Sequence, residues 1–134
     1  MRRFIVAILF ALVLPTASFA NDTMREGYWE ITTTMEMPGM PMEMPPTKIN
    51  HCYTKADVKD QKKIITADNN CTVTDLKQAG NKITWTMKCT GQNAGDFSGE
   101  TVYSGDTYDS TMKMQTQGQS MNMKVKGKRL GNCP

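Results

Sequence analysis

One short segment of the chain concentrates a single chemistry. Five methionines lie within residues 35–46, MEMPGMPMEMPP, where prolines, glutamates and a glycine separate them. Thioether sulfur is a soft ligand that needs no deprotonation, so such a cluster would suit Cu(I) or Ag(I). Met40, Met42 and Met44, together with His51, would supply the ligands of this metal site.

The same methionines also have an apolar interpretation. Met35 and Met37 continue the apolar alternation of the preceding residues, and the later methionines lie in a proline-stiffened loop. Methionine side chains are flexible and adapt to irregular surfaces. The first hypothesis is therefore a module that binds a small apolar ligand or an envelope partner through the interior of the β-structure and the methionine loop at its mouth; the soft-metal site is the alternative. The proposed loop residues are Met35, Met37, Met40, Met42 and Met44.

Residues suited to catalysis are sparse. The only histidine is His51, and the sequence contains no H-E-x-x-H motif, P-loop or dinucleotide glycine pattern. The 13 acidic residues are scattered and single out no carboxylate pair. We therefore expect a binding protein that is not an enzyme and needs no cofactor. His51 is expected to be a partly buried, hydrogen-bonded strand residue, and Trp29 and Trp85 to anchor the core.

The N-terminus has the features of a secretory signal. Residues 1–20 contain two arginines, an apolar run from Phe4 to Leu14, and Ser18-Phe19-Ala20 at the cleavage position. The apolar run is shorter than the roughly 20 residues of a spanning helix, so no membrane span is expected after cleavage. Residues 21–134 then form a single exported β domain, periplasmic or secreted.

The exported part is nearly neutral. Of the 16 lysines and arginines, two lie in the signal, which leaves 14 against 13 acidic residues. A nearly neutral domain offers no electrostatic basis for binding nucleic acid.

Four cysteines lie in the exported part, and an even number in an oxidising compartment predicts two disulfides. No C-x-x-C spacing occurs, which argues against zinc. Cys71 and Cys89 are equidistant from Gly80, so a hairpin there would place them face to face and leave Cys52 to pair with Cys133. The alternative, Cys52 with Cys71 and Cys89 with Cys133, remains open.

Alternating segments predict strands. Residues 27–37, GYWEITTTMEM, have a period of two, and residues 47–53 form a second short strand. Thr54 and Asp57 match a capping box, which predicts one short helix.

The second half predicts consecutive hairpins with turns at Gly80-Asn81, Gly105-Asp106 and Gly118-Gln119. These registers oppose Tyr103 with Tyr108, Phe97 with Met114, and Met114 with Met123. They place on one apolar face Phe97, Tyr103, Tyr108, Met112, Met114, Met121, Met123 and Val125. Lys124, Lys126 and Lys128 fall on the other, solvated face. The predicted fold is an all-β, antiparallel, up-and-down meander of about seven strands, barrel-like rather than a sandwich, with one short helix and two disulfides.

Several segments together resemble one family. GYWEITTTMEMPGMP, CYTKAD, SGETVYSGDTYDSTMKM and GKRLGNC, with the four cysteines, are similar to the exported bacterial family numbered three-six-one-seven among the domains of unknown function. The resemblance covers nearly all of the exported part and implies a single exported domain, but no activity. A smaller likeness is to lipocalin-like barrels, in which a Gly-x-Trp on the first strand packs under a basic residue of the last strand; Gly27-Tyr28-Trp29 and Arg129 are similar.

Overall fold

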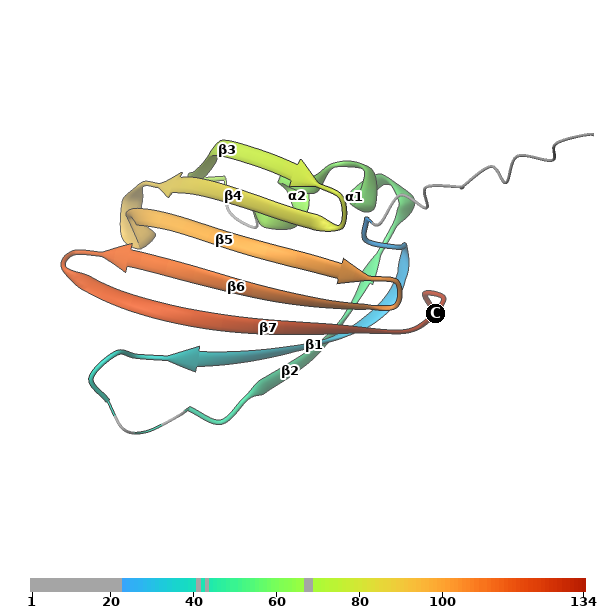
Figure 1. The fold of residues 1–134 in the computed structure, drawn as a ribbon, viewed down its shortest axis with the longest axis horizontal. Helices are drawn as coiled ribbons and strands as arrows, with labels where there is room; N and C mark the ends of the chain where they lie inside the picture. Colours follow the sequence, from blue (N-terminus) through green and yellow to red (C-terminus); the bar gives the residue numbers. More distant parts are fainter. Residues whose placement is uncertain (1–22, 41, 43, 67–68) are drawn as a thin grey trace, which may run out of the picture.

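Seven antiparallel strands form a single curved sheet (Figure 1). The computed structural model describes residues 23–134 except 41, 43 and 67–68, so the predicted signal lies outside the described residues. The strands are β1 (Gly27–Glu36), β2 (Thr47–Tyr53), β3 (Cys71–Ala79), β4 (Lys82–Cys89), β5 (Gly95–Ser104), β6 (Thr107–Thr116) and β7 (Gln119–Gly131). Two helices, α1 (Lys55–Lys59) and α2 (Gln61–Ile65), connect β2 to β3, and a 3₁₀ turn, Gly91–Asn93, connects β4 to β5.

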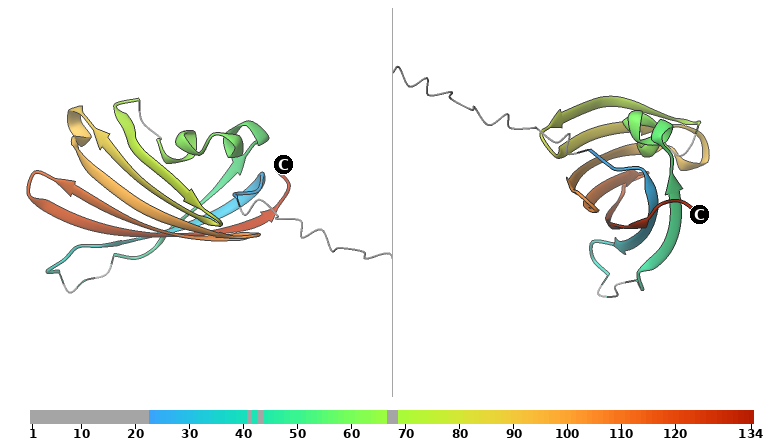
Figure 2. Two further views of the ribbon diagram at one scale, coloured as in Figure 1. Left: turned by 45° about the horizontal axis from the view of Figure 1, so that its top comes forward. Right: turned by 90° about the vertical axis from the view of Figure 1, so that its right-hand side faces the viewer.

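The strand order is that of an up-and-down barrel that has not closed. Strands β3 to β7 follow one another as hairpins, β7 pairs with β1, and β1 pairs with β2. The predicted seven-stranded antiparallel meander is therefore confirmed. Because β2 and β3 form the two edges of the sheet, the molecule is an open trough rather than a barrel (Figure 2).

The gap between β2 and β3 is bridged by helices. Thr54 and Asp57 form the predicted capping box at the start of α1. The sequence predicted one helix, but there are two, because the Asp60 side chain accepts a hydrogen bond from the Lys62 N–H and caps a second helix. Val58, Ile64 and Ile65 pack against the core of the sheet. The helices thereby cover the concave face at the end where β2 finishes (Figure 2).

The two faces of the sheet differ in chemistry. The concave face carries the buried core, which includes Trp29, Ile83, Trp85 and Val125. The convex face carries ion pairs between neighbouring strands, such as Lys82 with Glu100, Lys124 with Glu36 and Lys126 with Asp109. These pairs are solvent-exposed, so they contribute little to stability and mainly keep this face in water.

The last hairpin corrects one predicted register. Its turn is Gln117-Gly118 rather than Gly118-Gln119, and both turn residues have positive φ, 41° and 82°. Met114 consequently pairs with Met121, and Met112 with Met123. The error shifts the register by two residues, which leaves the same side chains on the concave face. The turns at Gly80-Asn81 and Gly105-Asp106 are as predicted.

Both disulfides have the first of the two predicted pairings, Cys52 with Cys133 and Cys71 with Cys89. A register shift between Val73 and Asp75 brings Cys71 opposite Cys89. Without this bulge, the two-residue turn at Gly80-Asn81 would place Cys71 opposite Thr90. The Cys52–Cys133 bridge ties the C-terminus to the edge strand β2.

Candidate functional site

Methionines from neighbouring strands lie side by side on the concave face. Met112 of β6 is opposite Met123 of β7, and Met114 is opposite Met121. Met35 of β1 lies opposite Met123 on its other side. Directly opposed residues have Cβ atoms about 4.5–5.5 Å apart. Two antiparallel strand pairs, β6 with β7 and β7 with β1, therefore assemble a contiguous patch of thioether side chains.

This patch forms the wall of an apolar cavity of about 170 Å³. Trp85 and Met87 are buried residues of β4, whereas the methionines of β6 and β7 are half-buried. The cavity, called the methionine cavity below, is lined by Ile65, Trp85, Met87, Phe97, Met112, Met114, Met121 and Met123.

A second cavity, of about 200 Å³, adjoins the first beneath α2 and shares Ile65, Trp85 and Met112 with it. This end is hydroxyl-rich. The Thr101 and Ser110 hydroxyls are hydrogen-bonded at 2.8 Å, and the Tyr103 hydroxyl donates to Oε1 of Gln61 at 3.5 Å. This part of the trough, called the tyrosine end below, is lined by Tyr53, Tyr103 and Tyr108 and lies under the helices.

The three phenols of the tyrosine end are held in their neutral form. Burial raises the pKa of Tyr103 to about 12 and raises the pKa of Tyr108 further still. Burial also raises the pKa of Tyr53, although a side-chain hydrogen bond with Tyr108 opposes that shift. At neutral pH these groups are hydrogen-bonding partners rather than acids or bases.

On its other side the methionine cavity opens into a groove of about 530 Å³. The two spaces share Ile65, Met87, Phe97 and Met114. The Cys71–Cys89 disulfide and residues 92–94 form the rim of this groove. The methionine cavity and the groove are therefore contiguous, and the groove lies at the end of the sheet where β3 begins and β4 ends.

The side chains that line the methionine cavity are all apolar. Together with its two neighbours, the cavity reaches the roughly 300–1,000 Å³ that small-molecule sites occupy. This arrangement can hold an apolar chain with a small polar end.

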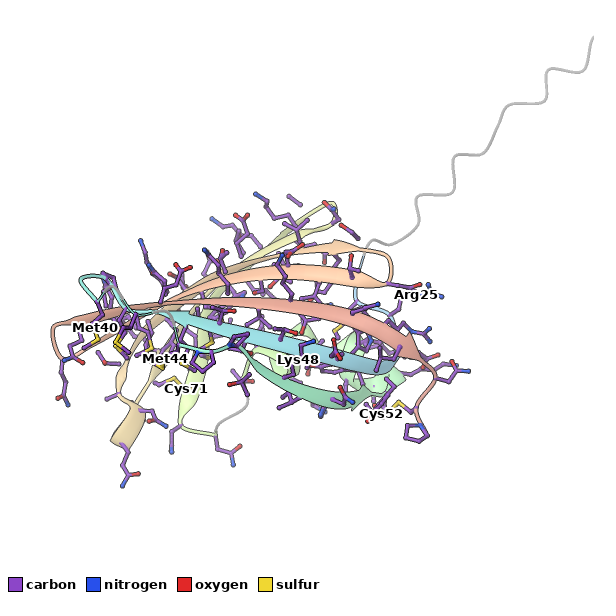
Figure 3. The ribbon with its side chains drawn as sticks, turned by 90° about the horizontal axis from the view of Figure 1, so that it is seen from below. Arg25, Met40, Met44, Lys48, Cys52 and Cys71 are labelled. Carbon is purple, nitrogen blue, oxygen red and sulfur yellow. A yellow bond between two sulfur atoms is a disulfide. The ribbon has the colours of Figure 1, made fainter. Side chains whose placement is uncertain are left out.

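The loop methionines lie elsewhere. Met40, Met42 and Met44 are 66%, 81% and 40% exposed in the connection between β1 and β2. Figure 3 shows Met40 and Met44 at the end of the molecule opposite Arg25 and Cys52. Of the five predicted loop residues, Met35 is on β1 beside Met123, and the carbonyl of Met37 accepts a hydrogen bond from the Met40 N–H.

His51 lies far from the loop methionines. It lies opposite Trp29 on β2, four residues beyond Thr47 and hence about 13 Å along the strand. The side chain is exposed on this edge strand and packs edge-on against the Tyr53 ring at 4.5 Å, so the prediction of partial burial was wrong. The structure thus separates His51 from Met40, Met42 and Met44, the other three residues of the predicted metal site.

Trp29 and Arg129, the two residues of the lipocalin-like pattern, are neighbours on β1 and β7. Trp29 is fully buried, and its indole N–H donates to the Arg25 carbonyl at 3.0 Å. Arg129 Nε donates to the Glu26 carbonyl at 2.8 Å. These contacts fix the start of β1 against the end of β7, and Trp29 acts as a core anchor as predicted.

The sequence did not identify the residues that line the methionine cavity as a candidate site. Met112, Met114, Met121 and Met123 lie on the predicted apolar face, which is confirmed, but alternation alone does not show that this face forms the wall of a cavity. Their signal was the methionine spacing itself, two residues apart on each of two adjacent strands.

Other kinds of site find little support in the described residues. Within the described part of the chain, no group of three or more His, Cys, Asp or Glu side chains is placed to hold a metal ion. Among the same residues, no helix has the length and hydropathy needed to cross a membrane.

Residues 24–133 match the family described as "Protein of unknown function (DUF3617)", and the chain belongs to this family. No curated protein and no solved structure gave a match.

Proposed function

We propose that this DUF3617 member is an exported binding protein that takes up a small apolar ligand in the methionine cavity and performs no chemistry on it. The observation that supports the proposal most directly is an apolar cavity, walled by half-buried methionines, that opens to solvent through a groove. Methionine adapts its shape to a bound molecule at little cost, so such a wall suits ligands of varied outline.

The shape of the trough supports a narrow, elongated ligand. The apolar part of the ligand would occupy the methionine cavity, and a small neutral polar end would reach the tyrosine end. There the hydroxyls of Tyr103, Thr101 and Ser110 already form hydrogen bonds, so a polar group would exchange partners with them. Apolar burial is worth roughly 25 cal/mol for each Å² removed from water and would supply most of the affinity.

A binding role without catalysis fits the chemistry of the site. The methionine cavity has no titratable side chain in its lining, and the neighbouring phenols stay protonated at neutral pH. A periplasmic or secreted location is supported by the two disulfides, which persist in oxidising compartments, and by the signal-like residues 1–20.

A fluorescence titration with N-phenyl-1-naphthylamine tests the proposal on disulfide-intact protein of residues 21–134. Met112→Gln keeps the length of the side chain but puts an amide into the cavity, and we expect it to weaken binding of the probe. The matched control is Lys113→Gln, the next residue on β6, which faces the convex side and should leave binding unchanged. Absence of probe binding in the wild type, or equal effects of the two substitutions, would refute the cavity as the site.

The exposed loop methionines favour a second candidate role, as an adaptable contact surface for an envelope protein. Met42 has 81% of its surface exposed, which is a large apolar exposure for a soluble domain. A photo-crosslinker at position 42 should give a discrete adduct in cells, whereas one at Lys126 on the convex face should not. The same adduct pattern from both positions would argue against this role.

A further inference from the structure

We propose that Met112, Met114, Met121 and Met123 form a thioether site for a soft monovalent cation, Cu(I) or Ag(I), inside the methionine cavity. The proposal is independent of apolar-ligand binding and concerns residues outside the loop 35–46. It rests on the cross-strand geometry, on the absence of harder donors from the cavity lining, and on access from the groove.

The geometry brings four sulfurs within reach of one ion. Met112 faces Met123 and Met114 faces Met121, and the two pairs are consecutive on the concave face of one hairpin. Opposed Cβ atoms lie about 4.5–5.5 Å apart and diagonal neighbours about 7–8 Å apart. Methionine has three rotatable side-chain bonds, so its sulfur can move by several ångströms to meet a shared ion.

The pairing does not end at this hairpin. Met35 continues the row on β1, opposite Met123. On β5, Phe97 lies opposite Met114 and also opposite Met87 of β4. Met87 lines the same cavity and provides one more thioether next to the four.

The donor set determines which cation it would hold. The cavity lining contains no carboxylate, imidazole or free thiol, and the four cysteines are all in disulfides. Thioethers alone are poor ligands for Zn²⁺, Mg²⁺ or Ca²⁺ but suit Cu(I) and the similarly soft Ag(I). The Trp85 indole lines the same cavity, and aromatic rings of this kind attract cations.

The distribution of residue types along the trough also points to the sulfurs. Where the concave face is covered, the buried positions on the strands include Trp29, Ile31, Ile83 and Val125, which are rigid side chains that fill space. Where it is open to the groove, the corresponding positions on β6 and β7 are methionines, and these remain half-buried. An ion entering from the groove therefore meets thioethers directly.

The decisive experiment compares two sets of methionine-to-leucine substitutions. The cavity variant carries leucine at Met112, Met114, Met121 and Met123; the control variant carries leucine at Met40, Met42 and Met44 of the loop. Leucine keeps volume and apolarity and removes only the sulfur. Each protein, residues 21–134 with both disulfides formed, is titrated anaerobically with Cu(I) against bicinchoninate and, separately, with Ag(I).

We expect the wild type and the loop variant to bind one ion per chain and the cavity variant to lose this binding. Zn²⁺ should bind none of the three proteins. Wild type that fails to compete for Cu(I), or a cavity variant that still competes, would overturn the proposal. Binding that disappears in the loop variant alone would place the site in the loop and equally overturn it.

Two further measurements keep the result interpretable. In wild-type protein with ¹³C-methyl-labelled methionine, Ag(I) should shift the methyl signals of Met112, Met114, Met121 and Met123 and leave that of Met40 in place. This test does not depend on the folding of any variant, and shifts at Met40 alone would refute the proposal. The cavity variant should still bind N-phenyl-1-naphthylamine, so a failure of metal binding is distinguishable from a failure of apolar-ligand binding.

Discussion

Replacing Gly99 with alanine should destabilise the protein through one contact. Gly99 lies on the concave face of β5, opposite Trp85 of β4 and Met112 of β6. A Cβ at this position would lie 2.5 Å from Cζ2 and 2.6 Å from Cε2 of the Trp85 indole. Real Cβ atoms do not approach other atoms so closely, so the ring would have to move.

The magnitude follows from two opposing effects. Overpacking a core costs about 1–3 kcal/mol. Replacing glycine by alanine where the backbone conformation is compatible gains about 0.4–1 kcal/mol, because the unfolded chain loses freedom. We therefore expect Gly99→Ala to lower the free energy of unfolding by about 1.3 kcal/mol, and by no more than about 2.6 kcal/mol. The displaced indole would also intrude on the methionine cavity, so affinity for an apolar probe should fall.

A double-mutant cycle isolates this contact. In a Trp85→Leu background the ring is absent, and Gly99→Ala should then be neutral or stabilising by up to about 1 kcal/mol. The free energies come from urea unfolding followed by circular dichroism, with the disulfides intact and the m-value checked for constancy. If Gly99→Ala costs the same in both backgrounds, the indole does not lie against Gly99 and the reasoning fails.

Three other predictions concern stability. Loop-closure entropy predicts that replacing Cys52 and Cys133 by serine, which opens a separation of 81 residues, costs about 4.5 kcal/mol, against about 3 kcal/mol for Cys71 and Cys89 with a separation of 18; thermal melts that rank the pairs the other way would contradict this. Met114→Lys puts a charge against the methionine cavity and should lower the melting temperature, whereas Lys126→Met on the convex face should leave it nearly unchanged; equal melting temperatures would mean that the faces are misassigned. The pKa of Tyr103 is about 12 in the folded protein and about 10 in the unfolded chain, so the stability that this phenol contributes is complete below pH 10 and is lost between about pH 10 and 12. In urea titrations the Tyr103→Phe variant should therefore lose less stability than the wild type over this pH range. An identical decline in both proteins would rule out Tyr103 as the source of the pH dependence.

The hairpins show how far periodicity alone can go. Alternation identified which residues of β5, β6 and β7 share the concave face, because a side-chain period of two is insensitive to register errors of two residues. It did not decide between Gly118-Gln119 and Gln117-Gly118 as the last turn, since that choice depends on Gln117 adopting positive φ. The position of the glycine suggested a turn at Gly118-Gln119, whereas the backbone turns one residue earlier, at Gln117-Gly118.

Closure of the sheet was beyond the reach of local patterns. The capping box at Thr54 was visible, but the second helix depends on Asp60, whose role becomes clear only once α1 ends there. Whether β2 pairs with β3 is decided by what fills the space between them. That space is bridged by the segment carrying Val58, Ile64 and Ile65, which pack against the core, and a contact between distant segments leaves no periodic trace in the sequence.

The candidate site was hidden for a related reason. An alternating apolar strand looks the same whether its face is filled core or the wall of a cavity, and the four methionines of β6 and β7 satisfy both descriptions. The conspicuous loop, 35–46, attracted the functional hypotheses because its composition is unusual. In the structure, Met40, Met42 and Met44 are exposed to solvent, and the methionines of β6 and β7 line the cavity.

The open end of the trough follows from the lengths of its elements. Strands β5 and β6 have ten residues each and therefore run for about 33 Å. Helices α1 and α2 have five residues each, about 7.5 Å apiece, so even end to end they would cover less than half of that length. The remaining concave surface would be an exposed apolar patch unless something occupies it at least part of the time. Rigid aliphatic residues would leave that patch fixed in shape, whereas methionines can fold over one another when it is empty and separate when it is filled. The position of the methionines at the uncovered end therefore suits the reversible occupant that we propose, whether an apolar molecule, a soft cation, or each in turn.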